Sequence, residues 1–473
     1  MTKFSNREKI TSQCERLLYV LIITLVFEGI VRKLFPVLRT PVFFLKDILC
    51  MIILFKVASL KLEGVVSRLR SAWSILFVMF LPLLNYTSFK DPMLAMFAAK
   101  QYLLYIITGV GVAISFSDSN DERFRRFIFF VAVMIMPTAL VAIIQNALPA
   151  SHWLNLSVGG ESLEGFSAGG YLRVASTFSF TAQYSFFLVA ESFFLATSFF
   201  LPPKKLFGFS SRYKGPIYFL LAVMLVISAF ITGGRTAVLG FSATFLLGFL
   251  LISIKWPGWF LKGGLVIAAG IVMLTVIKTL KPEFFMAYEE RSMGSESATH
   301  EEELTTRILG GFTEWISWFR DQDDTSIWFG NGLGVMSNGS AIVSSYASEA
   351  RQDGFWTEGD MATTFWEGGI YLAIIWYGFR LWMIVTCYRL WRKLRNRTYS
   401  MAAAIPMAYI AIQGIIAPLG IQPPLSIWWW MAIGIVTFVV RSEQSLLVRV
   451  VQTNNSPADH PRFYPNPFPG WSL

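Results

Sequence analysis

The amino-acid sequence predicts an all-α integral membrane protein, a polytopic bundle of about twelve transmembrane helices. Three observations lead to this fold class. Hydrophobic residues make up 54% of the 473 residues and charged residues only 15%, and the mean hydropathy is +0.53. Apolar runs long enough to cross a hydrocarbon core about 30 Å thick recur along the chain. Because lipid offers no water to backbone N–H and C=O groups, such runs fold as helices.

Twelve apolar segments are expected to cross the membrane. The first leads into further spans without a small-residue cleavage site, so residues 1–16 are predicted to be a retained cytoplasmic N-terminus. Residues 17–280 are expected to hold nine spans, and residues 361–440 three. The segments cover residues 17–35, 41–60, 71–89, 93–116, 124–148, 177–201, 215–233, 236–254, 261–280, 361–386, 401–419 and 424–440.

Lys and Arg residues are concentrated in alternate connections between these segments, most densely at residues 389–397. Because cytoplasmic loops carry an excess of Lys and Arg, this pattern places both termini in the cytoplasm. The net charge of +10 is therefore a topology signal, and no nucleic-acid partner is predicted. Residues 149–176 and 281–360 become large outer loops. Residues 441–473, rich in Asn, Ser and Pro toward their end, are expected to form a disordered cytoplasmic tail.

Residues 281–360 form the one long stretch that is too polar for lipid. They contain half of the 30 acidic residues, and connections of this length are usually lids, binding loops or disordered segments. Residues 304–319 repeat apolar side chains every three or four positions, which predicts an amphipathic helix. The glycines of residues 330–334 indicate a tight turn. We expect this loop to be the working part of an otherwise apolar scaffold.

Several kinds of chemistry are excluded by motifs that the sequence lacks. No Walker loop, nucleophile elbow or zincin motif is present. Cys14, Cys50 and Cys387 have no paired spacing, and the three histidines of the chain are scattered. The sequence therefore predicts neither a metal site nor a cofactor.

Three arginines are expected at the outer face, against the positive-inside bias: Arg173, Arg235 and Arg307. A guanidinium group presents a planar fork that matches phosphate oxygens and stays charged at physiological pH. A diphosphate-linked lipid would supply such an anion at the outer leaflet. Contact with lipid headgroups or with nearby carboxylates is the competing interpretation of each arginine.

Charged residues also bracket the outer turn between the first two segments, and charges at membrane depth are functional hypotheses by default. Arg32, Lys33, Lys46 and Asp47 are candidates to support the site. Glu28 lies four residues before Arg32, on the same helix face, so a structural ion pair between these two is the alternative.

Three acids where the large loop re-enters the membrane are the candidate catalytic residues: Glu358, Asp360 and Glu367. A carboxylate facing the bundle interior can act as a general base. Glu358 and Asp360 can instead cap the N-terminus of the following helix. For Glu367, packing or an ion pair with Lys100 or Arg380 is the competing interpretation.

Three of these features together resemble the bacterial O-antigen polymerase (Wzy) and O-antigen ligase superfamily. Residues 173–178, Arg-Val-Ala-Ser-Thr-Phe, look like the family's arginine-led segment before a middle helix. Residues 231–236, Ile-Thr-Gly-Gly-Arg-Thr, look like its Ser-Arg turn, with Gly at the usual Ser position. The large outer loop before the third-last helix is shared in kind. The resemblance implies a GT-C-like bundle in the bacterial cytoplasmic (inner) membrane, with the large loop in the periplasm.

The resemblance also implies an activity, because these proteins are glycosyltransferases that use undecaprenyl-diphosphate-linked sugars. It assigns the arginines to the lipid diphosphate and one acid to acceptor activation. Ligases of the group carry a histidine where the large loop enters the next helix, and residues 357–360 here, Thr-Glu-Gly-Asp, contain none. This favours a polymerase, for an exopolysaccharide or capsule-like glycan, over a ligase.

The expected partners are the lipid-linked oligosaccharide, the growing polysaccharide, membrane lipids, and chain-length regulator and export proteins. A transporter or flippase of lipid-linked oligosaccharides is the alternative from a different class of protein. Transporters tend to have broken helices and a site that is reached from both sides of the membrane. The polar residues of this sequence are weighted to one face, which favours the enzyme.

Overall fold

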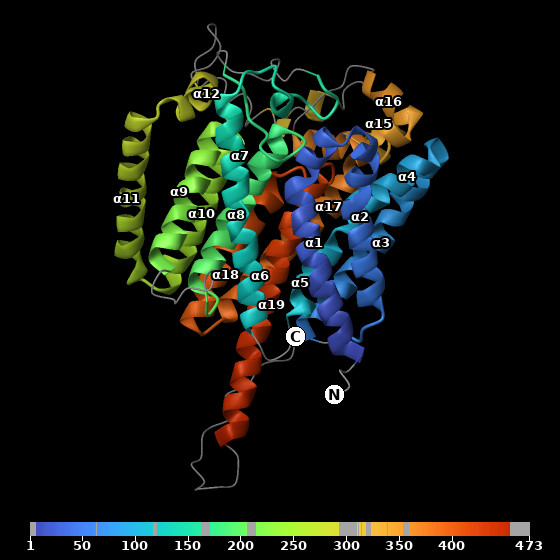
Figure 1. The fold of residues 1–473 in the computed structure, drawn as a ribbon. Helices are drawn as coiled ribbons and strands as arrows, with labels where there is room; N and C mark the ends of the chain where they lie inside the picture. Colours follow the sequence, from blue (N-terminus) through green and yellow to red (C-terminus); the bar gives the residue numbers. More distant parts are fainter. Residues whose placement is uncertain are drawn as a thin grey trace.

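A computed structural model describes residues 6–62, 64–116, 121–161, 171–205, 214–292, 310, 312–313, 315–317, 323–337, 339–352 and 359–454. Within these ranges the chain is mostly helical and has no β-strand (Figure 1). The long helices stand side by side, and several short ones lie at one end of the bundle (Figure 1).

The helices of the first half are α1 (Asn6–Leu34), α2 (Arg39–Ala58), α3 (Gly64–Lys90), α4 (Pro92–Ala99), α5 (Ile106–Ser115), α6 (Asp121–Val133), α7 (Ile135–Ala147) and α8 (Thr181–Phe200). A π-helical turn, η2 (Lys100–Leu104), joins α4 to α5. The second half has α9 (Lys214–Ile231), α10 (Arg235–Lys255), α11 (Trp259–Leu280), α12 (Glu283–Ser292), α14 (Asp324–Phe329), α15 (Ser340–Val343), α16 (Ser345–Gln352), α17 (Asp360–Lys393), α18 (Arg397–Ile416) and α19 (Pro423–Asn454).

Nine helical segments of the described ranges are long and apolar enough to cross a membrane. They are α3, α4 with α5, α6 with α7, α9, α10, α11, α17, α18 and α19. The prediction of a polytopic helical membrane protein is thus confirmed. The other three expected spans, α1, α2 and α8, are helices of 29, 20 and 20 residues in the same bundle. They are not among these nine segments, so the count of about twelve spans stays a prediction.

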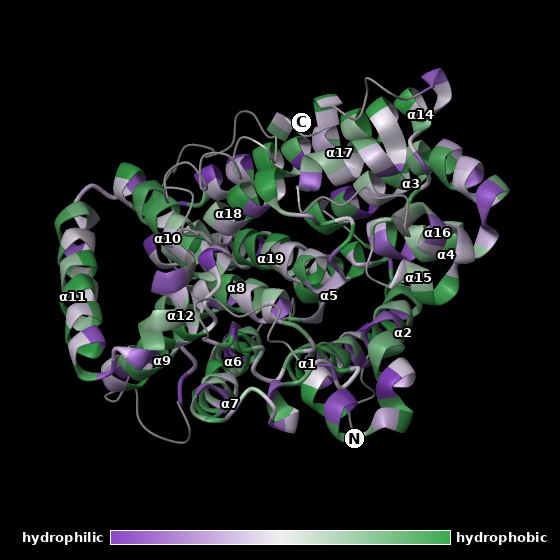
Figure 2. Ribbon diagram, turned by 90° about the horizontal axis from the view of Figure 1, so that it is seen from above, coloured by the Kyte–Doolittle hydropathy of each residue, from purple (hydrophilic) through white to green (hydrophobic). Residues whose placement is uncertain are grey.

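The core of the bundle lies where α5, α8, α18 and α19 meet, and Figure 2 shows α5, α8 and α19 at the centre of the view from above. The apolar part of α19 is 94% buried, whereas that of α11 is 6% buried. Small residues permit this close packing: a Cβ on Gly109 of α5 would lie 2.5 Å from the carbonyl oxygen of Trp430 in α19. α11 stands apart from the core in both views (Figures 1 and 2).

The short helices α12, α15 and α16 lie at the end of the bundle opposite to the start of α1 (Figure 1). This is the end at which the sequence predicts the large outer loop. α19 projects from the other end and remains helical to Asn454, beyond the predicted last span. Residues 455–473 lie outside the described ranges, and so does most of the predicted amphipathic helix at 304–319, of which residues 310, 312–313 and 315–317 are helical.

The helix α17 is broken at Gly369, where the sequence predicts one continuous span. Gly369 has φ +60° and ψ −156°, a conformation that favours glycine because it has no Cβ. A Cβ there would also lie 2.4 Å from the carbonyl oxygen of Ile327. Asp360 and Arg380 form an ion pair, although 20 residues of straight helix would separate them by about 30 Å. The part before Gly369 therefore lies back against the part after it.

Candidate functional site

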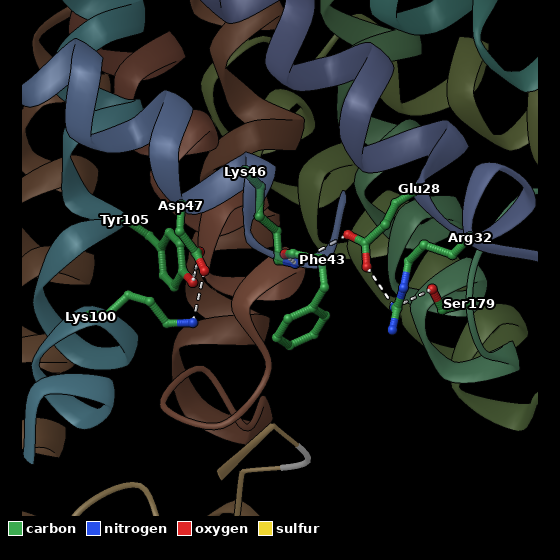
Figure 3. A network of polar contacts seen from close by, with 8 residues as sticks. All are labelled: Glu28, Arg32, Phe43, Lys46, Asp47, Lys100, Tyr105 and Ser179. Carbon is green, nitrogen blue, oxygen red and sulfur yellow. Dashed lines mark hydrogen bonds and ion pairs between the residues drawn. The ribbon is translucent and has the colours of Figure 1, made fainter. Parts of the chain in front are cut away.

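A network of charged side chains joins α1, α2 and the segment before α8 (Figure 3). It lies at the end of the bundle that the sequence predicts to face outward, which we call the outer end. Arg32 donates to Glu28 (3.0 Å) and to the hydroxyl of Ser179 (3.0 Å). Lys46 donates to the other oxygen of Glu28 (3.1 Å) and to the carbonyl oxygen of Phe43. The structural ion pair between Glu28 and Arg32 is thus present, but as one part of a larger network.

The network continues to the π-helical turn through Asp47. Lys100 donates to one oxygen of Asp47 (2.8 Å), and the hydroxyl of Tyr105 donates to the other (2.6 Å). The ring of Phe43 lies between the two halves (Figure 3). The Lys46 Nζ, the Arg32 Cζ and the Lys100 Nζ lie 4.2, 5.1 and 5.8 Å from its centroid, a favourable arrangement for cations.

This network has three cations for two carboxylates, so it carries one positive charge in excess. The side chains of Arg32 and Lys100 are each 15% exposed, whereas Lys46 is 2% exposed. Lys33 is separate, since its Nζ donates to the carbonyl oxygen of Leu154 (2.8 Å) in the first outer loop. The excess charge and the partial exposure suit the network to an anion.

The segment that carries Arg173 is held tightly across the end of α1. The amide of Ile30 donates to the carbonyl oxygen of Thr177 (2.9 Å), and a Cβ on Gly29 would lie 1.9 Å from the carbonyl carbon of Phe178. Ser176 adopts φ +53°, an uncommon conformation for a residue with a Cβ. Strained residues persist where the surrounding structure determines them, often at functional sites.

Two hydrogen bonds fix Ser176 in this conformation. Its amide donates to the side-chain oxygen of Gln145 (2.6 Å), and its hydroxyl donates to the carbonyl oxygen of Thr138 (2.6 Å). The segment thus fixes the position of Arg173 at its start and of Ser179, the partner of Arg32, at its end. It connects the network of Arg32, Lys46 and Lys100 around Phe43, called the Phe43 network, to a second group of cations, Arg173 and Arg235.

The structure brings Arg173 and Arg235 to the same place. Gly233 turns the chain with φ +60°, and a Cβ there would lie 3.3 Å from Cγ of Arg173 and 3.1 Å from Cβ of Ala287 in α12. Arg235, two residues later, begins α10 and is 8% exposed. Two of the three predicted arginines therefore share one site next to α12. Arg307 lies outside the described residues.

Glu367 anchors the glycine turn of the large loop. It is fully buried and accepts hydrogen bonds from the hydroxyl of Tyr102 (2.6 Å) and the amide of Met336 (2.8 Å). Gly330 has φ +70°, and a Cβ there would lie 2.4 Å from the amide nitrogen of Gly368. The glycine therefore allows the loop backbone to lie directly against α17, and Glu367 ties the two together.

Asp360 has a comparable role within α17 and between α17 and α18. It accepts from Arg380 (2.5 Å) and from the hydroxyl of Tyr377 (2.7 Å). Arg380 is fully buried and also donates to the carbonyl oxygens of Gly414 (2.7 Å) and Ala417 (2.8 Å). The cations proposed as partners of Glu367 thus pair elsewhere, Arg380 with Asp360 and Lys100 with Asp47. The third candidate acid, at position 358, lies outside the described residues.

The large outer loop lies over the Phe43 network. A Cβ on Gly339 would lie 3.0 Å from the ring of Phe43, and one on Gly334 would lie 3.1 Å from Cβ of Ala98. The side chain of Gln101, next to Lys100 in the chain, donates to the hydroxyl of Ser337. The loop that the sequence marks as the working part therefore contacts the elements that hold the cations.

Lys100 is the cation of the network that the sequence analysis named only as an ion-pair partner. It is the single charged residue of the apolar run 93–116, and an isolated intramembrane charge is itself a functional signal. The residues that the structure describes contain no group of His, Cys, Asp and Glu that could hold a metal ion. No protein-family model and no curated protein matches the chain. The functional assignment therefore rests on the geometry of this chain.

Proposed function

We propose that this protein is a membrane glycosyltransferase of the Wzy polymerase and ligase type, with twelve spans and a GT-C-like bundle. It transfers oligosaccharide repeat units from a lipid diphosphate to a growing polysaccharide at the outer face of the bacterial cytoplasmic membrane. One observation carries the proposal. Cations from five separate segments lie in two groups at the outer end of the bundle, Arg32, Lys46 and Lys100 around Phe43, and Arg173 and Arg235 next to α12, and both groups lie beside parts of the large loop.

These cations suit the leaving group of the reaction. An acceptor hydroxyl attacks the anomeric carbon of the donor, a new glycosidic bond forms, and the bond from that carbon to the diphosphate oxygen breaks. Negative charge develops on the departing lipid diphosphate while the acceptor proton is released. A preorganised donor aimed at such charge contributes about 3 kcal/mol to transition-state stabilisation. The donor stores the energy of the new bond, so the proposal requires no nucleotide.

The two described acids are assigned to positioning. Glu367 holds the glycine turn, and Asp360 holds Arg380, so each already has a structural task. The large loop would hold the acceptor glycan above the cations, and such proximity accelerates a bimolecular step. The proton of the acceptor hydroxyl would then pass to the carboxylate of Glu358, the remaining member of the predicted set, acting as general base.

The decisive experiment is reconstitution of the purified protein with a lipid-diphosphate-linked repeat unit. Arg173→Ala and Arg235→Ala are each expected to lower the rate of chain elongation about 100-fold, with normal insertion into the membrane. Lys281→Ala is the matched control, because Lys281 is an outer-end cation with a 60% exposed side chain that pairs with Glu283. Polymer of normal length from both arginine variants would refute the proposal.

A carrier of lipid-linked oligosaccharides is the second candidate, and one observation favours it. The backbone is irregular within two of the candidate spans, at the break of α17 at Gly369 and at the π-helical turn η2. Broken helices of this kind line the substrate sites of transporters. The same proteoliposomes separate the two functions, since elongation without translocation supports the enzyme and translocation without elongation supports the carrier. A ligase would instead use a lipid acceptor in place of the growing glycan.

A further inference from the structure

Glu191 is an acid at the centre of the bundle that the proposed reaction does not use. It is the eleventh of the 20 residues of α8, the only charged residue of this helix, and fully buried. Neither of its carboxylate oxygens has a hydrogen-bond partner among the described residues. Buried polar groups nearly always have such partners, so an acid in this position calls for an explanation.

Trp428 of α19 lies against the face of α8 that carries Glu191. Phe187, Glu191 and Phe194 are spaced four and three residues apart, so they share one helix face. The ring centroids of Phe187 and Phe194 lie 6.0 and 5.9 Å from that of Trp428. The indole N–H of Trp428 is buried and has no hydrogen-bond partner in the described part of the chain.

Tyr409 of α18 lies at the same depth. The hydroxyl of Thr197 in α8 donates to the carbonyl oxygen of Ala402 in α18 (2.9 Å), which sets the relative height of these helices. Tyr409 is seven residues above Ala402 and Glu191 six residues above Thr197, heights of about 10 and 9 Å at 1.5 Å per residue. The Tyr409 ring packs on Phe193 (4.7 Å between centroids), and its hydroxyl also lacks a partner within the described ranges.

None of the described helices packed against α8, which are α6, α9, α10, α18 and α19, carries a positive charge at this depth. The charged residues of α10 are at its two ends, Arg235 and Lys255, and α19 has none before Arg441. The remaining ionisable groups of these helices lie toward the inner end: Lys214 and Tyr218 of α9, Arg397 and Tyr399 of α18, Glu443 and Arg449 of α19, and Asp121, Glu122, Arg123, Arg125 and Arg126 of α6. A charged carboxylate without a counter-ion in an apolar interior is strongly unfavourable, and such groups neutralise instead.

We propose that Glu191, Tyr409 and Trp428 form a proton-binding site at the centre of the bundle. Glu191 binds the proton, and the tyrosine hydroxyl and the indole N–H supply the hydrogen-bonding groups, directly or through buried water. The site is independent of the outer cations, so it stands whether the protein is a polymerase or a carrier. Loss of the proton would place an uncompensated negative charge where α8, α18 and α19 meet.

Infrared spectroscopy of the protein in lipid at neutral pH tests this site. The wild type is expected to show the carbonyl stretching band of a protonated carboxylic acid, which shifts in D2O and is lost in Glu191→Gln. Tyr409→Phe or Trp428→Phe is expected to shift the band, because each removes a hydrogen-bond donor. Glu443→Gln is the control, since Glu443 is a buried acid that accepts from the amides of Arg395 and Asn396, and this variant is expected to keep the band.

A second measurement needs no variant. A hydrophobic carbodiimide adds the O–H of a protonated carboxylic acid across its C=N bond, and the acyl group then shifts to nitrogen, so all atoms remain in one adduct. Mass spectrometry of the wild type is expected to locate this adduct on Glu191. Absence of both the band and the adduct, or a band that persists in Glu191→Gln, would overturn the proton site. A band that neither Tyr409→Phe nor Trp428→Phe shifts would overturn the three-residue site.

Discussion

The substitution Asp360→Asn tests whether the role of Asp360 is structural or catalytic. In the wild type the carboxylate of Asp360 is the counter-ion of a guanidinium group that is fully buried. The asparagine keeps the shape of the side chain and can still accept a hydrogen bond from the hydroxyl of Tyr377. It removes the negative charge, however, so Arg380 is left with the carbonyl oxygens of Gln413, Gly414 and Ala417 as its polar contacts.

The expected loss in the free energy of unfolding follows from this change of partners. Removal of one partner of a buried ion pair costs about 3–5 kcal/mol, because the other charge is left buried without compensation. The lower end of this range applies here, since the three carbonyl oxygens continue to solvate the guanidinium. Asp360→Asn is therefore expected to lower the free energy of unfolding by about 3 kcal/mol. Arg380→Met should cost at least as much, because it strands a carboxylate and three carbonyl groups.

The assay is denaturant-induced unfolding of both single variants and the double variant in detergent, combined with chain elongation per folded molecule. The double variant removes both charges, so its loss of stability should be clearly smaller than the sum of the two single losses. A loss below about 1 kcal/mol for Asp360→Asn, or strictly additive losses, would refute the structural role. If folded Asp360→Asn protein inserts normally but does not elongate chains, Asp360 takes part in the chemistry and its assignment to positioning is wrong.

Three further outcomes are expected. Gly330→Ala should detach the glycine turn from α17, because the new Cβ would meet the backbone of Gly368 and because φ is +70° at this position. Faster proteolysis of the outer loop is the expected result, and unchanged proteolysis would contradict it. Glu367→Gln keeps an acceptor oxygen and should retain most of the elongation activity. Loss of elongation in this variant would instead identify Glu367 as the general base. The pKa of Asp91, a residue between α3 and α4, is lowered by the hydroxyl of Ser344 and then by backbone N–H groups. Its stabilising contribution is therefore full above the usual Asp pKa and lost as pH falls below about 4, so proteolysis of the loop should increase in acid, and Asp91→Asn should remove that pH dependence.

The helices could be predicted from the sequence because the signal is local. Each of the twelve apolar runs coincides with a helix or a continuous helical pair, since a run of apolar residues in lipid has no other way to satisfy its backbone. The break in α17 could not be predicted in this way. Gly368 and Gly369 are adjacent, and only the approach of Ile327 and Trp328 to Gly369 shows which one carries the unusual φ.

Of the candidate site, the two arginines could be predicted from the membrane topology. Arg173 and Arg235 stand out because they oppose the positive-inside bias, and the structure places them beside one another. The roles of the acids depend on partners distant in sequence, which the local pattern does not contain. Tyr102 and Met336 donate hydrogen bonds to Glu367, which therefore anchors the loop, and Arg380 pairs with Asp360.

The distribution of packing between the two ends favours the enzyme over the carrier. A carrier must open the inner end of the bundle to release its substrate. Around the connection between α5 and α6, on the side where α1 begins, this end is filled by aromatic rings. Phe124 stacks on Phe438 (3.9 Å between centroids), and Phe116 packs on Phe127 (5.1 Å). All four rings are buried, and separating them would expose a large apolar area and leave cavities in a close-packed core.

The outer end differs, because its charged groups are partly exposed and its covering loop is attached through hydrogen bonds such as that from Lys90 to the carbonyl oxygen of Asn331 (3.2 Å). The proposed transfer between two substrates at the outer face requires access from one side only, and this distribution of packing agrees with that requirement.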